Sequence, residues 1–150
     1  MSDANENGSI AEYLYLLGLS VGSAHPQARI DSSAIEVVQS KFAAFNQHDV
    51  AAIESIYAAG ALLNSPDYRN LVGNKPIAET YRKLFDAIPD AKDNVELLEA
   101  AGNHIYVQFV LSGHWNGIAD KPLGVRIMAV YKVVDGRIVD DATYYDRKAP

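Results

Sequence analysis

The C-terminal stretch Val133–Asp146, which reads VVDGRIVDDATYYD, carries four carboxylates within one turn and one strand. Asp135 precedes a glycine, and this dipeptide is typical of a tight hairpin, so we expect Asp135 to serve the turn. Asp140, Asp141 and Asp146 follow on a segment rich in β-branched and aromatic residues, which predicts a strand. A carboxylate that faces a cavity can act as a general acid or base when its surroundings move its pKa toward neutrality. The chemistry of the chain therefore depends on which of these aspartates faces inward.

His114, in the sequence SGHWNG, is a second candidate for proton transfer. Its imidazole titrates near neutrality, which suits a proton shuttle. The alternative is that a histidine next to Trp115 in a glycine-bounded stretch is an ordinary loop or strand-edge residue. The four histidines are scattered without metal-ligand spacing, and the chain has no cysteine, so we expect neither a metal site nor thiol chemistry.

The composition is that of an ordinary globular protein, with 49% hydrophobic and 21% charged residues among 150. This length fits one domain with a substantial core. The net charge of −6 and the absence of a clustered basic run argue against nucleic acid or an anionic membrane as a partner. We therefore expect a small molecule as the ligand.

The first thirty residues form a separate unit in the sequence. The apolar segment Ile10–His25 follows Asp3 and Glu6 rather than the positive charges of a secretory signal, and it is too short and interrupted to span a bilayer. We expect residues 1–30 to be a helix or arm that packs on the domain or on a partner subunit, and residues 31–150 to be the domain itself. A cytoplasmic location is expected, with a cryptic export signal as the alternative.

Hydrophobic periodicity divides the domain into helices followed by strands. The pattern predicts helices from Asp31 or Ser32 to about Gln47, over Val50–Ala59, and after Gly73 as far as Ile88; the predicted strands are Ala61–Leu63, 95–100, 105–111, 125–134 and 138–145. Helices followed by an antiparallel meander are typical of an α+β domain, in which a curved sheet folds over its helices. Such a sheet leaves a cone-shaped cavity in which a small apolar ligand can sit.

Several motifs carry a resemblance to a known superfamily. They are FAAFNQHDVAAI at 42–53, IYAAGA at 56–61, GNKPIA at 73–78, FDAIPD at 85–90, SGHWNGI at 112–118, VYKVVDGRIV at 130–139 and YYD at 144–146. Their order and spacing resemble the nuclear-transport-factor-2-like (NTF2-like) superfamily, and the chain is most similar to its SnoaL-like polyketide cyclase group, over roughly residues 35 to 146. The resemblance implies a cone of three N-terminal helices packed on a curved, mainly antiparallel sheet that encloses a pocket. It also implies a homodimer formed through the outer face of the sheet, at Met128, Val130 and Ala142.

The resemblance assigns reactive positions that this chain fills with other residues. The acid on the last strand of the cyclases falls on Thr143, and the inward acid or histidine on the preceding strand falls on Ala129. The base of the steroid isomerases falls near Ser65, and the arginine and aspartate of the epoxide hydrolases fall near Phe109 and Leu111. None of these side chains exchanges a proton at neutral pH, so none of the three reaction templates is intact.

Strand alternation then shows which residues could replace them. If Thr143 faces inward, so do Asp141, Tyr145 and, on the preceding strand, Tyr131, while the other two aspartates of the last strand face away. Asp141 is thus the only aspartate of that strand that we expect to face inward. It is either a functional acid in the cavity or a solvated or capping residue at the cavity's edge. Thr143, Tyr131 and Tyr145 are expected to hold and polarise an oxygen of the ligand.

The resemblance adds candidates outside the last strand. Asp67 lies in the loop that supplies the base of the related isomerases, where it is either an acid with a raised pKa or an ordinary turn residue. Asn64, in the same loop, is a candidate for ligand binding. Lys41 matches a pocket tyrosine of the steroid isomerases; it either enters the cavity as an amine base or anion-binding group, or extends its charge to water.

The leading hypothesis is an enzyme of the SnoaL-like type that needs no cofactor. It would remove a proton next to a carbonyl of a small apolar compound, in a cyclase or isomerase type of reaction, with His114 or Asp67 as the acid or base. One alternative is a non-catalytic NTF2-like module that binds a ligand or a partner, and a further one is an epoxide hydrolase-like enzyme. A buried His, Asp or Lys inside the cavity would favour an enzyme, whereas a cavity with only hydroxyls and aromatics would favour a binding module.

Overall fold

A computed structural model describes residues 32–147, so the expected N-terminal helix or arm lies outside the described residues. Within this range three helices and six strands form, in the order α2 Ser32–Asn46, α3 Val50–Ile56, β1 Tyr57–Asn64, β2 Leu71–Val72, α4 Asn74–Ala87, β3 Lys92–Ala101, β4 His104–His114, β5 Pro122–Val134 and β6 Arg137–Tyr144, with a 3₁₀ turn η1 at Trp115–Gly117. Over the same residues, none of the helices is long and apolar enough to cross a membrane.

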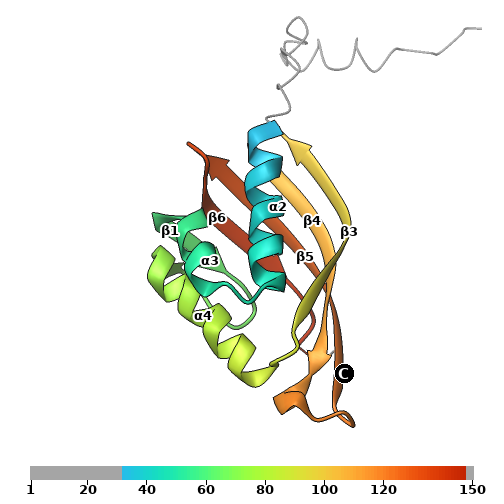
Figure 1. Ribbon diagram of the computed structural model, residues 1–150. Coiled ribbons are helices and arrows are strands. Elements are labelled where there is room, and N and C mark those ends of the chain that lie inside the picture. Colours follow the sequence, from blue (N-terminus) through green and yellow to red (C-terminus); the bar gives the residue numbers. More distant parts are fainter. Residues whose placement is uncertain (1–31, 148–150) are drawn as a thin grey trace, which may run out of the picture.

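The six strands form one open, mixed sheet in the order β2-β1-β6-β5-β4-β3. All neighbours are antiparallel except β1 and β6, which run parallel. Figure 1 shows the long strands curving behind α2, with α3 and α4 on the same side of the sheet. This is the α+β arrangement of the NTF2-like fold, with the last strand of the chain in the interior of the sheet.

Helix α2 supplies the centre of the core. Its side chains Val38, Phe42 and Phe45 are buried at spacings of four and three residues, as the periodicity predicted, and they face the buried row of β4 that includes Val107 and Phe109. The ring of Phe42 contacts that of Phe109 edge to face, with centroids 4.9 Å apart. This helix therefore fixes the distance between the helical layer and the concave face of the sheet.

The second helix is shorter than predicted. It ends at Ile56, and Tyr57–Asn64 is a strand, whereas the sequence predicted a helix as far as Ala59. Alanines favour a helix locally, but β6 pairs with Tyr57 and again with Leu62–Asn64, so the segment between them is held in the sheet and tertiary context overrides the propensity. The change matters because it carries Tyr57 into the interior, next to the strand that holds Asp141.

The last two strands alternate as expected. Ala129, Tyr131 and Asp141 are buried on the inner face, whereas Met128 and Tyr144, which pair across the strands, are exposed on the outer face. Exposure of this outer face fits the homodimer that the resemblance implies. The homodimer itself stays a prediction.

Gly113, at the end of β4, packs closely on the connection between α4 and β3. Its φ of +152° favours glycine, and an added Cβ would overlap Ile88 Cγ2 and lie 3.0 Å from Asp90 Oδ1. Gly113→Ala should therefore lower the free energy of unfolding by about 2–3 kcal/mol, measured by urea titration.

Gly124→Ala is the matched control, because nothing lies within 4 Å of an added Cβ there and the backbone needs no glycine. A Gly113→Ala variant as stable as Gly124→Ala would contradict this packing.

Candidate functional site

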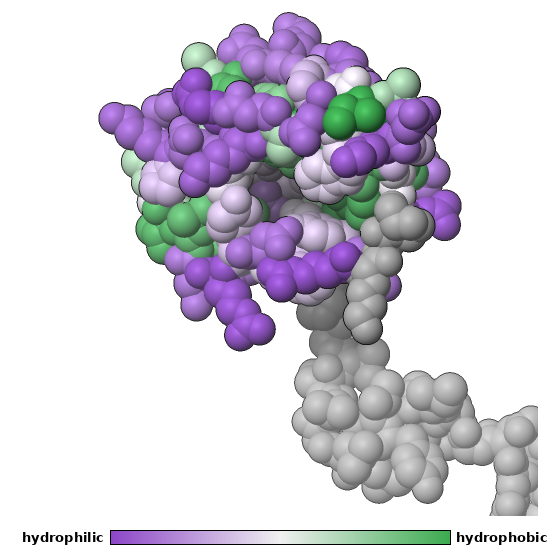
Figure 2. Space-filling view, turned by 90° about the horizontal axis from the view of Figure 1, so that it is seen from below, coloured by the Kyte–Doolittle hydropathy of each residue, from purple (hydrophilic) through white to green (hydrophobic). Residues whose placement is uncertain are grey.

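A cavity of about 680 Å³ lies between the helices and the concave face of the sheet. Figure 2 views the molecule from below and shows a central hollow with hydrophilic residues at its rim. Apolar side chains from both layers form most of the wall, among them Phe45, Leu63, Phe109, Leu111 and Ile127. This volume suits a small organic molecule, and its binding would be driven mainly by burial of apolar surface.

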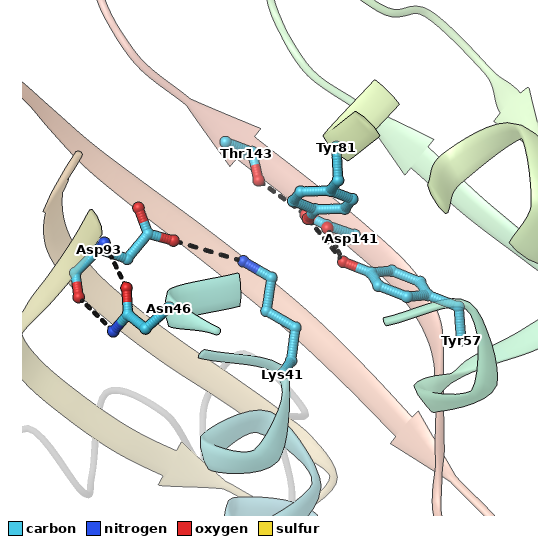
Figure 3. A network of polar contacts seen from close by, with 7 residues as sticks. All are labelled: Lys41, Asn46, Tyr57, Tyr81, Asp93, Asp141 and Thr143. Atoms are coloured by element: carbon cyan, nitrogen blue, oxygen red, sulfur yellow. Dashed lines mark hydrogen bonds and ion pairs between the residues drawn. The ribbon is translucent and has the colours of Figure 1, made fainter. Parts of the chain in front are cut away.

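An ion pair lies inside this apolar cavity. Lys41, on α2, places its Nζ 3.8 Å from Oδ2 of Asp93, on β3, and each side chain is only 2% exposed. Figure 3 shows the two side chains approaching each other from the helix and from the edge of the sheet. Both residues line the cavity, so a bound ligand can reach both charges.

Asn46 holds Asp93 in position. The Asn46 side chain accepts the Asp93 backbone N–H at 2.8 Å and donates to the Asp93 backbone carbonyl at 2.9 Å, a two-point clasp visible in Figure 3. Because β3 is an edge strand, the backbone groups of Asp93 on its open side have no neighbouring strand to pair with. The Asn46 amide forms the hydrogen bonds that such a strand would form. Lys41 and Asn46 both belong to α2, so one helix positions both partners of the ion pair.

Aromatic rings surround the ammonium of Lys41. Nζ lies within 4.3–5.6 Å of five ring centroids, those of Phe42, Phe45, Tyr81, Phe109 and Tyr131. Such rings attract a cation through their electron-rich faces, most strongly where water is excluded. The cavity therefore stabilises a positive charge at this point.

Burial raises the pKa of Asp93 from 3.8 to about 6, with the positive charge of Lys41 opposing the rise. Burial alone would lower the pKa of Lys41, but electrostatic interactions with Tyr81, Asp93 and Asp141 and a hydrogen bond with Tyr81 outweigh it, and the pKa of Lys41 ends above its ordinary value. Lys41 is thus an ammonium group and not an amine base. Asp93 titrates close to neutrality, where a carboxylate can both take up and release a proton.

A second buried carboxylate lies behind the cavity wall. Asp141, 1% exposed, accepts hydrogen bonds from the hydroxyls of Tyr57 and Thr143, each at 2.7 Å, and the Tyr57 hydroxyl is 3.0 Å from that of Tyr81. Burial raises the pKa of Asp141, while Lys41 and the two hydroxyl donors oppose the rise. In Figure 3 the Lys41 ammonium lies between this group and Asp93. Asp141 itself does not line the cavity, but Thr143 does.

The two residues expected to be the acid or base lie elsewhere. His114 ends β4 and bonds Asp90 twice, from its backbone N–H to Oδ1 at 2.8 Å and from its ring Nδ1 to Oδ2 at 2.7 Å. Its side chain is 39% exposed and does not line the cavity. Asp67 lies at the rim, half exposed; it pairs with Arg147 at 2.7 Å and accepts the Tyr145 hydroxyl.

Of the remaining candidates, three line the cavity and one does not. Tyr131, Thr143 and Tyr145 line the cavity. Asn64 does not line it, because its side chain accepts the backbone N–H of Asn70 at 2.8 Å and closes the loop between β1 and β2. Within residues 32–147, no group of three or more His, Asp or Glu side chains could hold a metal ion.

The sequence did not point to Asp93. The strand was predicted to begin at Val95, so Asp93 fell in a loop, whereas β3 begins at Lys92. Ala91 and Asp93 are both buried at a spacing of two, which is the one pattern that could have extended the strand backward. The position of the ion pair depends on packing between α2 and β3, two elements far apart in the chain.

A profile of the family described as SnoaL-like polyketide cyclase matches residues 36–150. The chain belongs to the SnoaL-like polyketide cyclase family. The match includes both partners of the ion pair as well as Asp141 and Thr143. A comparison with curated protein sequences gives no match.

Solved structures of the same fold are similar at low sequence identity. A protein with a ketosteroid isomerase-like fold from Catenulispora acidiphila, in complex with trimethylamine, is 20% identical, with a TM-score of 0.70, covering 76% of this chain and 88% of that one. An LEH-like epoxide hydrolase of M. tuberculosis is 16% identical, with a TM-score of 0.67 and coverages of 77% and 84%. IdmH of Streptomyces antibioticus, a candidate polyketide cyclase, is 20% identical, with a TM-score of 0.65 and coverages of 75% and 91%. At these identities the likeness establishes the fold alone.

The positions that the resemblance assigned to reactive groups do surround the cavity. Ser65, Phe109, Leu111 and Thr143 line it, and Ala129 is fully buried nearby on the inner face. The SnoaL-like family member described here thus has no carboxylate at these positions. Its buried carboxylate within the cavity comes from β3 instead.

Lys41→Met tests the ion pair. This change leaves Asp93 buried without its nearest cation and should cost about 3 kcal/mol of unfolding free energy near neutral pH. Adding Asp93→Asn should recover most of that loss, because the amide needs no counter-charge. Urea unfolding of the single and double variants measures both effects.

Lys83→Met serves as the control, since this exposed α4 residue should change stability by less than about 0.5 kcal/mol. Equal stabilities of Lys41→Met and Lys83→Met would refute the pairing.

The raised pKa of Asp93 makes stability depend on pH. Between 3.8 and about 6 the folded protein retains a proton on Asp93 that the unfolded chain has released. Stability must therefore fall as the pH rises through this window, by about 3 kcal/mol for a shift of this size. Relative to Asp93→Asn, in which this titration is absent, the wild type should lose about that amount between about pH 4 and about pH 7. A stability difference that does not change with pH would exclude the raised pKa.

Proposed function

We propose that this protein is an enzyme that works without a cofactor and removes a proton from the carbon next to a carbonyl of a small, largely apolar compound, in a cyclase or isomerase type of reaction. The observation that carries the proposal is the Lys41–Asp93 ion pair, a carboxylate with a pKa of about 6 beside a permanent cation within an apolar cavity. A cavity that only binds a ligand has no need of a buried charged pair, whose desolvation is costly.

Asp93 is the general base in this reaction. Its carboxylate takes the proton, the C–H bond breaks, and the electron pair of that bond enters the enolate. A base with a pKa near the working pH combines a large deprotonated fraction with useful basicity. Closure of a ring, or return of the proton at another carbon, follows from the enolate.

Lys41 and Tyr131 stabilise the oxygen on which the negative charge develops. Both line the cavity, and both rank among the most buried side chains of the described residues. Burial raises the pKa of Tyr131 well above its ordinary value, so its hydroxyl stays protonated and can donate. Fixed donors in a site without water stabilise an oxyanion more than they stabilise the neutral carbonyl.

Asp93 fits the role of the base better than His114 or Asp67. Two hydrogen bonds to Asp90 hold His114 outside the cavity lining, and Asp67 forms an ion pair with Arg147 at the rim. Epoxide hydrolysis would use the same carboxylate to activate water, but the positions of the arginine and aspartate of those enzymes hold Phe109 and Leu111. Proton abstraction from carbon therefore fits the cavity better.

The exchange of carbon-bound protons for deuterium tests the proposal without knowledge of the natural substrate. A panel of cyclic and aromatic ketones in heavy water, followed by proton NMR, reports enolate formation directly. The wild type should accelerate exchange in at least one ketone, and Asp93→Asn should lower that rate by a hundredfold or more, roughly the contribution of a general base. The rate should rise with pH to a plateau, with an apparent pKa of about 6.

Asp120→Asn, an exposed acid away from the cavity lining, is the control and should leave exchange unchanged. Ketone binding without any catalysed exchange would contradict the proposal and leave a ligand-binding module.

A further inference from the structure

The pair of Asp141 and Thr143 fixes the direction of a hydrogen bond at the cavity wall. The Thr143 hydroxyl lies 2.7 Å from Oδ1 of Asp141 and donates to it. A threonine hydroxyl has a single proton and two lone pairs. Since the proton points at Asp141, the oxygen can offer the cavity only lone pairs. Thr143 is therefore an acceptor toward a ligand, which differs from the expectation that it polarises an oxygen.

The hydrogen bonds behind Asp141 favour the same direction. Tyr57 donates to Oδ2 of Asp141, so its own proton is committed, and the contact of 3.0 Å between the Tyr57 and Tyr81 hydroxyls must use the proton of Tyr81. Every hydroxyl of the network thus donates toward Asp141. The charge of Lys41 acts in the same sense, because it favours the ionised form of Asp141 against the desolvation that raises the pKa of this carboxyl.

Three of the other polar groups that line the cavity complement this acceptor. Lys41 offers ammonium protons and Tyr131 a hydroxyl proton, whereas Asp93 takes a proton. A ligand that satisfies all four needs an oxygen acceptor for Lys41 and Tyr131 and a separate hydrogen-bond donor for Thr143. An unpaired acceptor in a buried wall costs binding energy, so the donor distinguishes one substrate from another.

We propose that the substrate is a hydroxylated carbonyl compound whose hydroxyl donates to Thr143, and that Asp141 is the positioning residue that holds the Thr143 hydroxyl as an acceptor. That the substrate has a carbonyl group rests on the proposed function. The acceptor role rests on the direction of the hydrogen bond from Thr143 to Asp141.

Matched probes measure the preference. The ring-hydroxylated isomers of one bicyclic aromatic ketone, each paired with its methyl ether, differ in whether they can donate at that oxygen. By calorimetry, at least one hydroxyl isomer should bind the wild type roughly tenfold more tightly than its ether. Thr143→Ser should keep the ratio, and Thr143→Val should reduce it to about one, since valine has no acceptor.

Asp141→Asn separates positioning from folding. Its amide can donate to Thr143 and release the threonine proton toward the cavity, so the preference for the hydroxyl should fall while the ether gains affinity. Tyr57→Phe, which also removes a partner of Asp141 but leaves the bond from Thr143, should keep the preference. Even if Asp141→Asn fails to fold, the two Thr143 variants decide the question.

Ratios of one for every isomer with the wild type, failure of every isomer to bind, or an undiminished ratio in Thr143→Val would each overturn the inference. Deuterium exchange recorded on the same samples keeps the two proposals apart. Exchange that depends on Asp93 without a hydroxyl preference refutes only the role of Thr143, and a preference without exchange refutes only the proposed reaction.

Discussion

The ion pair between Lys41 and Asp93 is the constraint on which the rest of the site depends. Two charges within an apolar cavity are tolerated only when each has a partner and when the surrounding groups compensate for lost water. Helix α2 meets this requirement by carrying both Lys41 and Asn46, which hold the carboxylate and its backbone. The aromatic rings around the ammonium add to the compensation, and both side chains are only 2% exposed.

This constraint also explains the second carboxylate. Asp141 lies too deep to contact a ligand, yet it shares the positive potential of Lys41 and gathers the hydroxyls of Tyr57 and Thr143. The cavity wall thus acquires fixed hydrogen-bond directions rather than rotating hydroxyls. Preorganised groups of this kind contribute to catalysis and to specificity, because they need no rearrangement when the ligand arrives.

Much of the fold could be predicted from the sequence, because it depends on local patterns. The periodicity of α2, the turn at Asp135 and the alternation of β5 and β6 each reflect side chains a few residues apart, and family motifs placed them in order. The start of β1 at Tyr57 was missed, because pairing with β6 on both sides of the alanines overrides their helical preference. The site was harder to predict for the same reason: Asp93 meets Lys41 only after α2 packs on the edge of the sheet. Thr143, by contrast, was placed at the cavity by family position and alternation, and its partner became visible only with the side chains.

The site works as proposed only if the buried carboxylate of Asp93 titrates near neutrality while Lys41 remains charged beside it. The most direct measurement is a carbon-13 NMR titration of the Asp93 side-chain carboxyl in the intact protein, assigned by its loss in Asp93→Asn. We expect a pKa of about 6, and a higher one in Lys41→Met, where the opposing charge is gone. A carboxyl of Asp93 that titrates at the ordinary value of an exposed aspartate would rule out Asp93 as a base tuned by burial.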